Sequence, residues 1–222
     1  MSQPTQEEIA QIREQLDDLP SLGAPIYETK DQSIYRFQIN DRDLIAKCYQ
    51  LRTLAQKTAA LFKRSRAHRS LRAGLRFHEA GINTPRPLLL AAEGKFIPDK
   101  AILVTDYCPF PALRNSLRDN EPVHPSTPGK ILNLLHQLSQ LNCSHGDFHA
   151  RNLLVDDEGI PHLIDLDGVR GHSSSGSLSK YICQDRDRFL KSLEPLPEHY
   201  RDYSAVLGEP ESSLPPLPSG LT

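Results

Sequence analysis

The sequence predicts a small α+β protein with two lobes, the first an antiparallel sheet with a helix and the second mostly helical. Three patterns lead to this prediction. Residues 33–49 alternate between apolar and polar side chains around a polar turn, as the strands of a β-hairpin do. Residues 51–80 change to helical spacing. Two more segments of helical spacing, 127–141 and 181–193, lie in the second half of the chain.

The first elements along the chain are a short helix and the hairpin. Residues 5–18 carry Ile9, Ile12 and Leu16 at spacings that place them on one helix face. Prolines and a glycine then break the chain before the hairpin strands SIYRFQI and LIAKCY, which the turn NDRD joins. Alternation in the second strand places Lys47 on the same face as Ile45 and Tyr49.

A helical segment and two more strands complete the first lobe. One apolar stripe of helical spacing runs from Leu51 to Phe62, Ala67, Leu71 and Leu75 continue another, and Gly81 supplies the stop. The runs PLLLAA and AILVT predict two strands joined around Gly94 and Pro98. The segment DYCPFP then leaves the sheet with two prolines, a change of composition that is typical of a hinge.

The second lobe begins with the helix over residues 127–141, in which Ile131, Leu134 and Leu138 belong to one apolar stripe. The runs NLLV and HLIDL predict short strands joined by the turn DDEG. We therefore divide the chain into four parts. They are an N-terminal helix and linker (1–25), a first lobe (26–107), a second lobe (108–208) and a disordered Pro- and Ser-rich tail (209–222).

Charge and cysteine content exclude several classes of protein. The 26 Lys and Arg against 28 Asp and Glu give a net charge of −2, so total charge predicts no nucleic-acid partner. The four cysteines are scattered without a C-x-x-C pair, which indicates free thiols in a reducing compartment. The acidic N-terminus lacks the apolar core of a signal peptide, and no apolar run approaches a membrane span. We expect a cytoplasmic protein.

The segment SHGDFHARNLLVDDEGIPHLIDLDG, residues 144–168, concentrates polar residues around the two short strands. Asp147 follows a helix, Asn152 lies five residues later, and Asp165 lies thirteen residues beyond that. Asp and Asn cap turns in many proteins, and the nearby histidines suggest zinc, although a zinc site usually has three or four ligands. The two fixed spacings in a strand–loop context favour a functional site over both readings.

The motif H-x-D-x-x-x-x-N, followed by a strand that ends in Asp, resembles the catalytic loop and metal-binding strand of the protein-kinase-like fold. The pieces GINTPRP, LVTDY and LIDLDG, in this order, resemble the bacterial lipopolysaccharide core kinases, the heptose and Kdo kinase family. The lysine of LIAKCY stands where that family has its strand lysine. The resemblance covers roughly residues 30–195.

The resemblance implies an ATP- and Mg²⁺-dependent kinase that phosphorylates a sugar hydroxyl, with heptose or Kdo of the lipopolysaccharide inner core as the expected acceptor. Such a transfer depends on charge neutralisation and alignment. Asp147 would orient the hydroxyl and accept its proton, while Asn152 and Asp165 would hold Mg²⁺, which prefers oxygen ligands. Arg151 or His149 would steady the transferred phosphoryl group, and the sequence leaves that choice open.

The same resemblance assigns nucleotide binding to the first lobe. Lys47 would neutralise the α- and β-phosphates, and the hinge residues Asp106, Tyr107 and Cys108 would line the nucleotide site.

Two features depart from the pattern. No glycine-rich loop precedes Lys47, and Ser70 aligns with the glutamate that usually pairs with the strand lysine. Two alternatives therefore stay open. HGD-x-H also resembles aminoglycoside and choline phosphotransferases, which suggests a small-molecule kinase, and the departures suggest a nucleotide-binding pseudokinase that serves as a scaffold.

Residues 63–76 concentrate basic side chains on a predicted helix. They are Lys63, Arg64, Arg66, Arg69, Arg72 and Arg76. Such a run is usually a solvated helix face. A polyanionic lipopolysaccharide precursor at the inner membrane gives a second interpretation, in which these residues make a peripheral contact with the anionic surface. The sequence does not decide between the two, and it does not indicate an oligomeric state.

Overall fold

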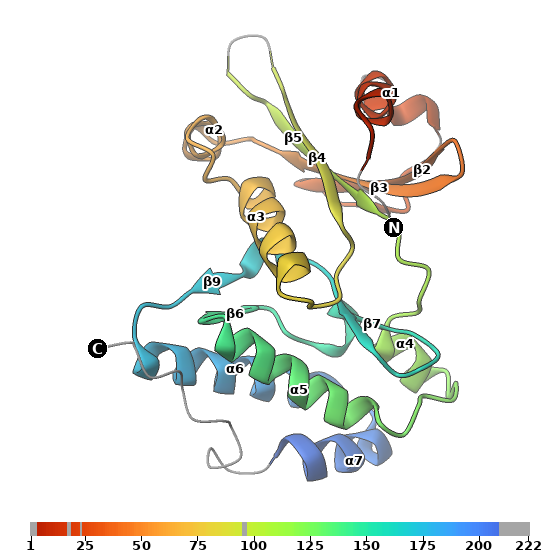
Figure 1. Cartoon of the computed structure of the whole chain (residues 1–222), viewed down its shortest axis with the longest axis vertical. Helices are drawn as coiled ribbons and strands as arrows, with labels where there is room; N and C mark the ends of the chain where they lie inside the picture. The colour runs from red at the N-terminus through yellow and green to blue at the C-terminus, as the bar shows by residue number, and fades with distance from the viewer. Residues whose placement is uncertain (1–3, 17–18, 23, 95–96, 209–222) are drawn as a thin grey trace. The chain divides into compact units, whose positions relative to one another are not determined.

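The computed structural model describes residues 4–16, 19–22, 24–94 and 97–208. The chain forms two compact units (Figure 1). Unit 1 comprises Met1–His78 and Pro85–Cys108, and unit 2 comprises Glu79–Thr84 and Pro109–Thr222. The predicted disordered tail, 209–222, lies outside the described residues.

Unit 1 is built on a five-stranded antiparallel sheet. Its strands are β1 (Tyr27–Glu28), β2 (Gln32–Ile39), β3 (Arg42–Gln50), β4 (Pro87–Glu93) and β5 (Lys100–Asp106), in the order β1-β2-β3-β5-β4. The predicted β2–β3 hairpin is confirmed. It turns at Asn40, whose positive φ of 52° suits asparagine in a tight turn.

Alternation along the strands gives the sheet two apolar faces. On one face, Leu44 and Ala46 of β3 pack with Ile12 and Leu16 of α1 (Gln6–Leu16), which leads into a short 3₁₀ helix, Leu19–Leu22. On the other face, Tyr49 packs with alanines of α2 (Leu54–Leu61) and α3 (Arg66–Glu79). The sheet therefore has helices on both faces (Figure 1), and Lys47 shares the face of Tyr49.

The predicted helical segment 51–80 is interrupted between α2 and α3. Phe62 caps α2 and Lys63 adopts the left-handed conformation, with φ of 54°. The Lys63 amide then donates to Ala60 O (3.0 Å) and the Arg64 amide to Ala59 O (2.6 Å), the two bonds of a Schellman C-cap. The left-handed position of this motif usually holds glycine. Because it is Lys63 here, the sequence carries no signal that the helix ends at this point.

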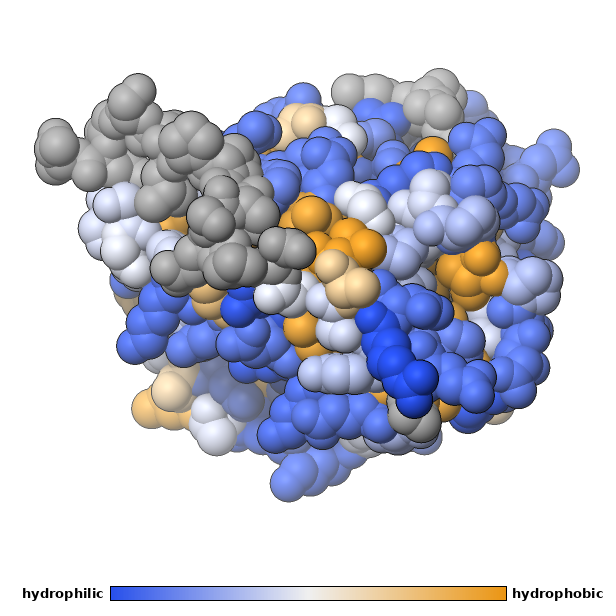
Figure 2. Space-filling model, turned by 90° about the horizontal axis from the view of Figure 1, so that it is seen from below, coloured by the Kyte–Doolittle hydropathy of each residue, from blue (hydrophilic) through white to orange (hydrophobic). Residues whose placement is uncertain are grey.

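Unit 2 is mostly helical. It contains α4 (Leu113–Arg118), α5 (Thr127–Gln140), α6 (Ser175–Leu193) and α7 (Pro197–Leu207), with the strand pairs β6–β9 (Cys143–Ser144, Arg170–Gly171) and β7–β8 (Leu153–Val155, Pro161–Leu163). The stripe predicted for α5 is buried at Ile131, Leu134 and Leu138. Helix α7, which the sequence analysis did not predict, packs on α5 and α6. The face shown in Figure 2 is mostly hydrophilic, with hydrophobic residues in small areas.

One short segment from the first half of the chain belongs to unit 2. The Leu163 amide of β8 donates to Asn83 O (2.8 Å), and Thr84 Oγ1 donates to Leu163 O (2.7 Å). The GINTPRP motif thus crosses from one unit to the other, because Glu79–Thr84 belong to unit 2 and Pro85 returns to unit 1.

Two further properties concern the whole described chain. None of the four cysteines forms a disulfide, in agreement with their scattered positions in the sequence. Among the described helices, none has the length and apolar character needed to cross a membrane.

Candidate active site

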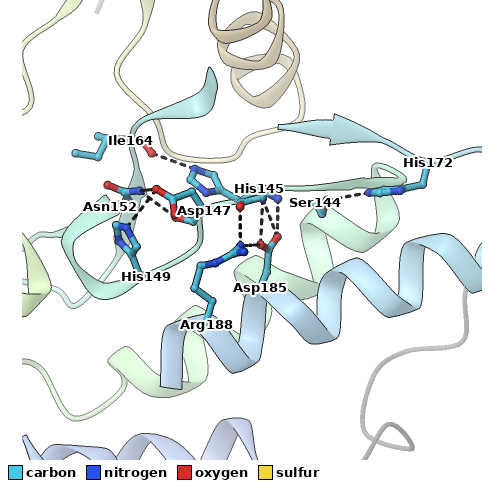
Figure 3. A network of polar contacts seen from close by, with 10 residues as sticks. Ser144, His145, Asp147, His149, Asn152, Ile164, His172, Asp185 and Arg188 are labelled. Atoms are coloured by element: carbon cyan, nitrogen blue, oxygen red, sulfur yellow. Dashed lines mark hydrogen bonds and ion pairs between the residues drawn. The ribbon is translucent and has the colours of Figure 1, made fainter. Parts of the chain in front are cut away.

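The loop between β6 and β7 brings Asp147 and Asn152 together. A single 3₁₀ turn, Ala150–Asn152, folds the chain back, and the Asn152 amide donates to His149 O (2.8 Å). The side chain of Asn152 then donates through Nδ2 to the backbone oxygen of Asp147 (2.9 Å) and to its Oδ2 (3.2 Å), as Figure 3 shows. Asn152 is buried, whereas the side chain of Asp147 is 45% exposed. The loop therefore fixes a carboxylate that solvent, and a substrate, can still reach.

His149 contacts both Asp147 and Arg151 through one nitrogen. Its Nε2 lies 2.7 Å from the donating Nε of Arg151 and 3.2 Å from Asp147 Oδ2. A neutral ring accepts from Arg151, and a protonated ring would donate to Asp147. Burial lowers the pKa of His149, although the charge of Asp147 opposes that shift. The neutral form is therefore favoured at neutral pH, and in that form His149 orients the exposed Arg151.

Asp165 lies two residues beyond the end of β8, and not at the end of the strand as predicted. It adopts a left-handed conformation with φ of 60° and ψ of 58°. This conformation costs on the order of 1 kcal/mol for a residue with a side chain, and such strain concentrates at functional sites. The preceding residue, Ile164, donates its amide to Asn152 O (3.0 Å). Asn152 is thereby tied both to the loop of Asp147 and to the segment that carries Asp165.

Two further contacts hold these loops together. His145 Nε2 donates to Ile164 O (3.0 Å), so the buried ring connects the Asp147 loop to the Asp165 segment (Figure 3). Gly146 has φ of 81°, and a Cβ there would lie 2.5 Å from Gly168 O. Only glycine tolerates both the conformation and the close approach. The backbone conformation of the loop and its contact with Gly168 therefore require glycine at position 146 of the HGD motif.

The oxygen atoms of Asn152 and Asp165 fit Mg²⁺ better than Zn²⁺. Since the side-chain nitrogen of Asn152, Nδ2, donates to Asp147, the side-chain oxygen Oδ1 is the atom that can accept a hydrogen bond or bind a metal. In the described part of the chain, no three His, Cys, Asp or Glu side chains form a metal-binding group. One carboxylate and one amide suit an ion that keeps several waters and takes further ligands from phosphates.

The structure reveals one residue that the sequence analysis did not single out. Asp185 of α6 is 1% exposed and accepts from the amides of His145 (2.6 Å) and Gly146 (3.0 Å). Arg188 donates to Gly146 O (2.5 Å) and lies 3.4 Å from the same carboxylate (Figure 3). Burial raises the pKa of Asp185, and the two amides and the Arg188 charge oppose this rise. Asp185 therefore anchors the start of the loop that carries Asp147.

A signal for Asp185 was present in the sequence. The buried side of α6 consists of Leu178, Ile182, Asp185, Phe189 and Leu193. An acidic residue in an otherwise apolar helical stripe must find hydrogen-bond donors inside the protein.

Asp185→Asn is expected to lower the free energy of unfolding by about 1–3 kcal/mol, because an amide NH₂ would replace one acceptor that faces backbone N–H groups. The matched control is Asp187→Asn, two residues along α6, where the aspartate is 65% exposed and pairs with Arg186. That variant should change the stability by less than about 1 kcal/mol. Urea denaturation of both variants measures the difference, and equal stability would show that Asp185 does not anchor the loop.

Buried histidines predict a loss of stability at acid pH. Burial lowers the pKa of His145 from 6.5, and its Nδ1 has no hydrogen-bond partner among the described residues. Below about pH 6.5 the unfolded chain then binds more protons than the folded one, so the free energy of unfolding falls as the pH falls. His149 and His172 have lowered pKa values for the same reason and act in the same direction.

We expect urea denaturation to report a lower free energy of unfolding at about pH 5.5 than at about pH 7.5. His145→Gln, which removes one of these titrations, should reduce the difference. Burial raises the pKa of Asp185 from 3.8, and this titration acts in the opposite direction, so the difference between the wild type and His145→Gln isolates the histidine effect. An equal dependence of the free energy of unfolding on pH in the two proteins would contradict this assignment.

The residues predicted to bind nucleotide lie in unit 1. Lys47 is paired in the sheet with Ile34 and Leu103, and its Nζ lies 5.3 Å from the centre of the Tyr49 ring. Asp106 ends β5, is 4% exposed, and binds Arg42 through both carboxylate oxygens (2.6 and 3.1 Å). Its side chain is therefore already used within the unit.

The two remaining hinge residues continue from β5. The Tyr107 amide donates to Asp43 O (3.0 Å), its ring carries the Arg36 guanidinium at 3.8 Å, and Cys108 is the last residue of unit 1. Ser70, at the position of the expected glutamate, is buried in α3.

The sheet of unit 1 and the Asp147–Asn152 loop of unit 2 define a phosphotransferase with the protein-kinase-like fold. Residues 28–207 match the family model described as "Lipopolysaccharide kinase (Kdo/WaaP) family", and the chain belongs to this family. This confirms the resemblance found in the sequence. Since the family consists of kinases, the chain is a kinase.

The comparison with solved structures supports the same fold. A structure described as "WaaP in complex with acyl carrier protein" matches with a TM-score of 0.56 and 14% sequence identity, over 92% of this chain and 88% of that one. Identity at this level shows the fold alone. No curated protein matches the sequence.

Proposed function

We propose that the protein transfers the γ-phosphoryl group of ATP, with Mg²⁺, to a hydroxyl of heptose or Kdo in the lipopolysaccharide inner core. The observation that carries the proposal is the fixed and accessible carboxylate of Asp147, held by the buried amide of Asn152 in a chain of this kinase family. The intact Asp147, Asn152 and Asp165 speak against the scaffold alternative, because a scaffold would not need all three.

Asp147 acts on the acceptor sugar. Its carboxylate orients the attacking hydroxyl and takes the proton as the new P–O bond forms. The bonds from Asn152 reduce the rotational freedom of this side chain, so little entropy is lost when the hydroxyl is aligned. Arg151, held by His149, supplies positive charge for the phosphoryl oxygens as they move from the nucleotide to the sugar.

Asn152 and Asp165 hold the metal in this mechanism. When bound, Mg²⁺ neutralises charge on the nucleotide phosphates. Ile164 helps to fix the spacing of the two ligands, because its amide donates to the backbone oxygen of Asn152 and Asp165 follows Ile164 directly. The left-handed backbone of Asp165 sets the direction in which its carboxylate leaves the chain.

Lys47 and the hinge bind the nucleotide in this proposal. The ammonium group of Lys47 neutralises the α- and β-phosphates. Because the carboxylate of Asp106 is bound to Arg42, we assign nucleotide contact at Asp106 to its backbone, next to Tyr107 and Cys108.

The proposed substrate also suggests where the protein works. Lipopolysaccharide precursors are polyanionic and amphipathic, so the kinase would meet them from the cytoplasm, at the surface of the inner membrane. The basic residues of 63–76 would make the peripheral contact.

The deciding experiment supplies Mg²⁺ and ATP labelled in its γ-phosphate to the purified protein. Three kinds of acceptor are offered in detergent solution. These are inner-core lipopolysaccharide lacking core phosphate, an aminoglycoside, and choline. We expect label only in the lipopolysaccharide and none when EDTA removes the metal. Label in the aminoglycoside or choline alone would establish the small-molecule alternative instead.

A further inference from the structure

The segment 52–78 of unit 1 has an unusual distribution of charge. It contains eight of the chain's 26 basic residues and none of its 28 acidic residues, although the whole chain has a net charge of −2. Two of the eight are paired outside the segment, Arg52 with Asp31 (3.6 Å) and Lys57 with Asp99. The other six are exposed on α3 and on the turn before it. They form a cationic surface.

The field of this surface affects a neighbouring group. The pKa of His68 is lowered first by burial and then by the charges of Arg72 and Lys63.

Large apolar side chains are exposed beside these cations. Leu54 is 70% exposed, Leu61 is 52% exposed and Phe62 is 74% exposed. Leu54 and Leu61 are seven residues apart and therefore lie on one side of α2. The sequence places both leucines in one apolar stripe of helical spacing, but α2 instead buries Ala60 against the sheet. Helix α2 thus exposes two leucines in a segment that is otherwise cationic.

A pocket lies between α2 and the start of α3. Arg64, Arg66 and Arg69 line it together with Tyr49 and Gln56, and its volume is about 270 Å³. The guanidinium of Arg66 lies 5.7 Å from the centre of the Tyr49 ring. Asp31 also lines the pocket, and Arg52 pairs with it. Three guanidinium groups around a recess of this size can bind phosphate oxygens through paired N–H donors.

A cationic surface alone could bind any polyanion. The exposed Leu54, Leu61 and Phe62 beside it indicate a partner that is apolar as well as anionic. An anionic bilayer offers phosphates at the level of the headgroups and acyl chains a few ångströms deeper, which matches a cationic surface next to an apolar one. The eight residues of α2 extend about 12 Å, too short to span a bilayer and suitable for lying in its interface.

We infer that α2 lies in the headgroup region of an anionic membrane, with Leu54, Leu61 and Phe62 inserted, while Arg64, Arg66 and Arg69 bind headgroup phosphates. This deepens the peripheral contact proposed above by adding insertion of α2 and a phosphate pocket. Binding is measured without ATP or acceptor, so its failure would leave the proposed kinase reaction untouched.

A tryptophan reporter tests the insertion directly. The chain contains no tryptophan, so Phe62→Trp introduces a single one. Its emission should shift to the blue with phosphatidylcholine vesicles that contain phosphatidylglycerol, and brominated acyl chains should quench it. Ile26→Trp is the matched control, because Ile26 is 62% exposed in the same unit but lies outside the segment. Its emission should not change.

Sedimentation with the same vesicles tests each component of the surface. Replacing Arg64, Arg66 and Arg69 together with glutamine should weaken binding by about 100-fold. The same replacement of the exposed Lys180, Lys191 and Arg201 changes the net charge equally and should weaken it much less. Leu54→Gln with Leu61→Gln should weaken binding by about 10-fold or more, whereas Ile26→Gln should not. These exposed sites should leave the fold intact, which circular dichroism checks.

Several results would overturn the inference. Binding of the wild-type protein that does not depend on phosphatidylglycerol would remove the role of the arginines. If the Phe62→Trp variant sedimented with vesicles but its emission did not shift, α2 would not be inserted in the membrane. No sedimentation at low salt, where charge attraction is least screened, would exclude a membrane as the partner of this surface.

Discussion

Asp147→Asn is expected to lower turnover by roughly 10²- to 10⁴-fold, the usual contribution of a positioned general base. This corresponds to about 3 to 5 kcal/mol of lost transition-state stabilisation. Asparagine keeps the size of the side chain, and its amide oxygen can still accept from Asn152 Nδ2, so the loop should hold its shape. What disappears is the negative charge and the capacity to take a proton.

Two measurements separate this effect from a general loss of structure. The affinity for ATP, measured by calorimetry, should hardly change, because the proposed role of Asp147 concerns the acceptor hydroxyl. Asp157→Asn, in the exposed turn after β7, is the matched control and should retain full turnover. An Asp147→Asn variant with the wild-type rate would remove Asp147 from the mechanism.

Asp165→Ala should abolish Mg²⁺-dependent turnover, with a loss of roughly 10³-fold or more, since a bound metal contributes several kcal/mol of charge stabilisation. Calorimetry should show that Mg²⁺ no longer strengthens ATP binding. Because Asp165 is left-handed, alanine also introduces backbone strain. Asp165→Asn and Asp165→Gly tolerate that conformation, and we expect both to be as inactive as the alanine variant.

The comparison of these three variants decides what Asp165 does. If the glycine and asparagine variants recovered turnover while the alanine variant did not, the backbone conformation would matter and the carboxylate would not. Turnover at the wild-type rate in all three would mean that the metal is held elsewhere.

The elements that the sequence predicts best are those specified by local patterns. The β2–β3 hairpin follows from strict alternation, and α5 follows from a single apolar stripe that the structure buries. The sequence also places Asp147 and Asn152 in one site, and the hydrogen bonds between them, which it did not predict, are local because one turn closes a spacing of five residues. These features depend on neighbours in the chain, which a sequence displays directly.

The features that the sequence analysis missed depend on unusual residues or distant partners. The break after α2 has a lysine where glycine is the usual signal, so helical spacing continued across it. The anchoring role of Asp185 depends on amides about 40 positions earlier in the chain, which spacing alone cannot identify. The roles of Lys47 and the hinge require a ligand, and they stay predictions.

The bonds from Asn83 and Thr84 to Leu163 have a consequence for synthesis on the ribosome. Thr84 and Leu163 are 79 residues apart in the chain. At about 5–20 residues per second, roughly 4 to 16 s pass between their syntheses. During this interval the strands of unit 1 on both sides of the segment can pair, while Glu79–Thr84 must wait for β8. The nascent protein therefore carries an unsatisfied loop while 79 of its 222 residues are synthesised, and a chaperone that binds exposed peptide would find it there.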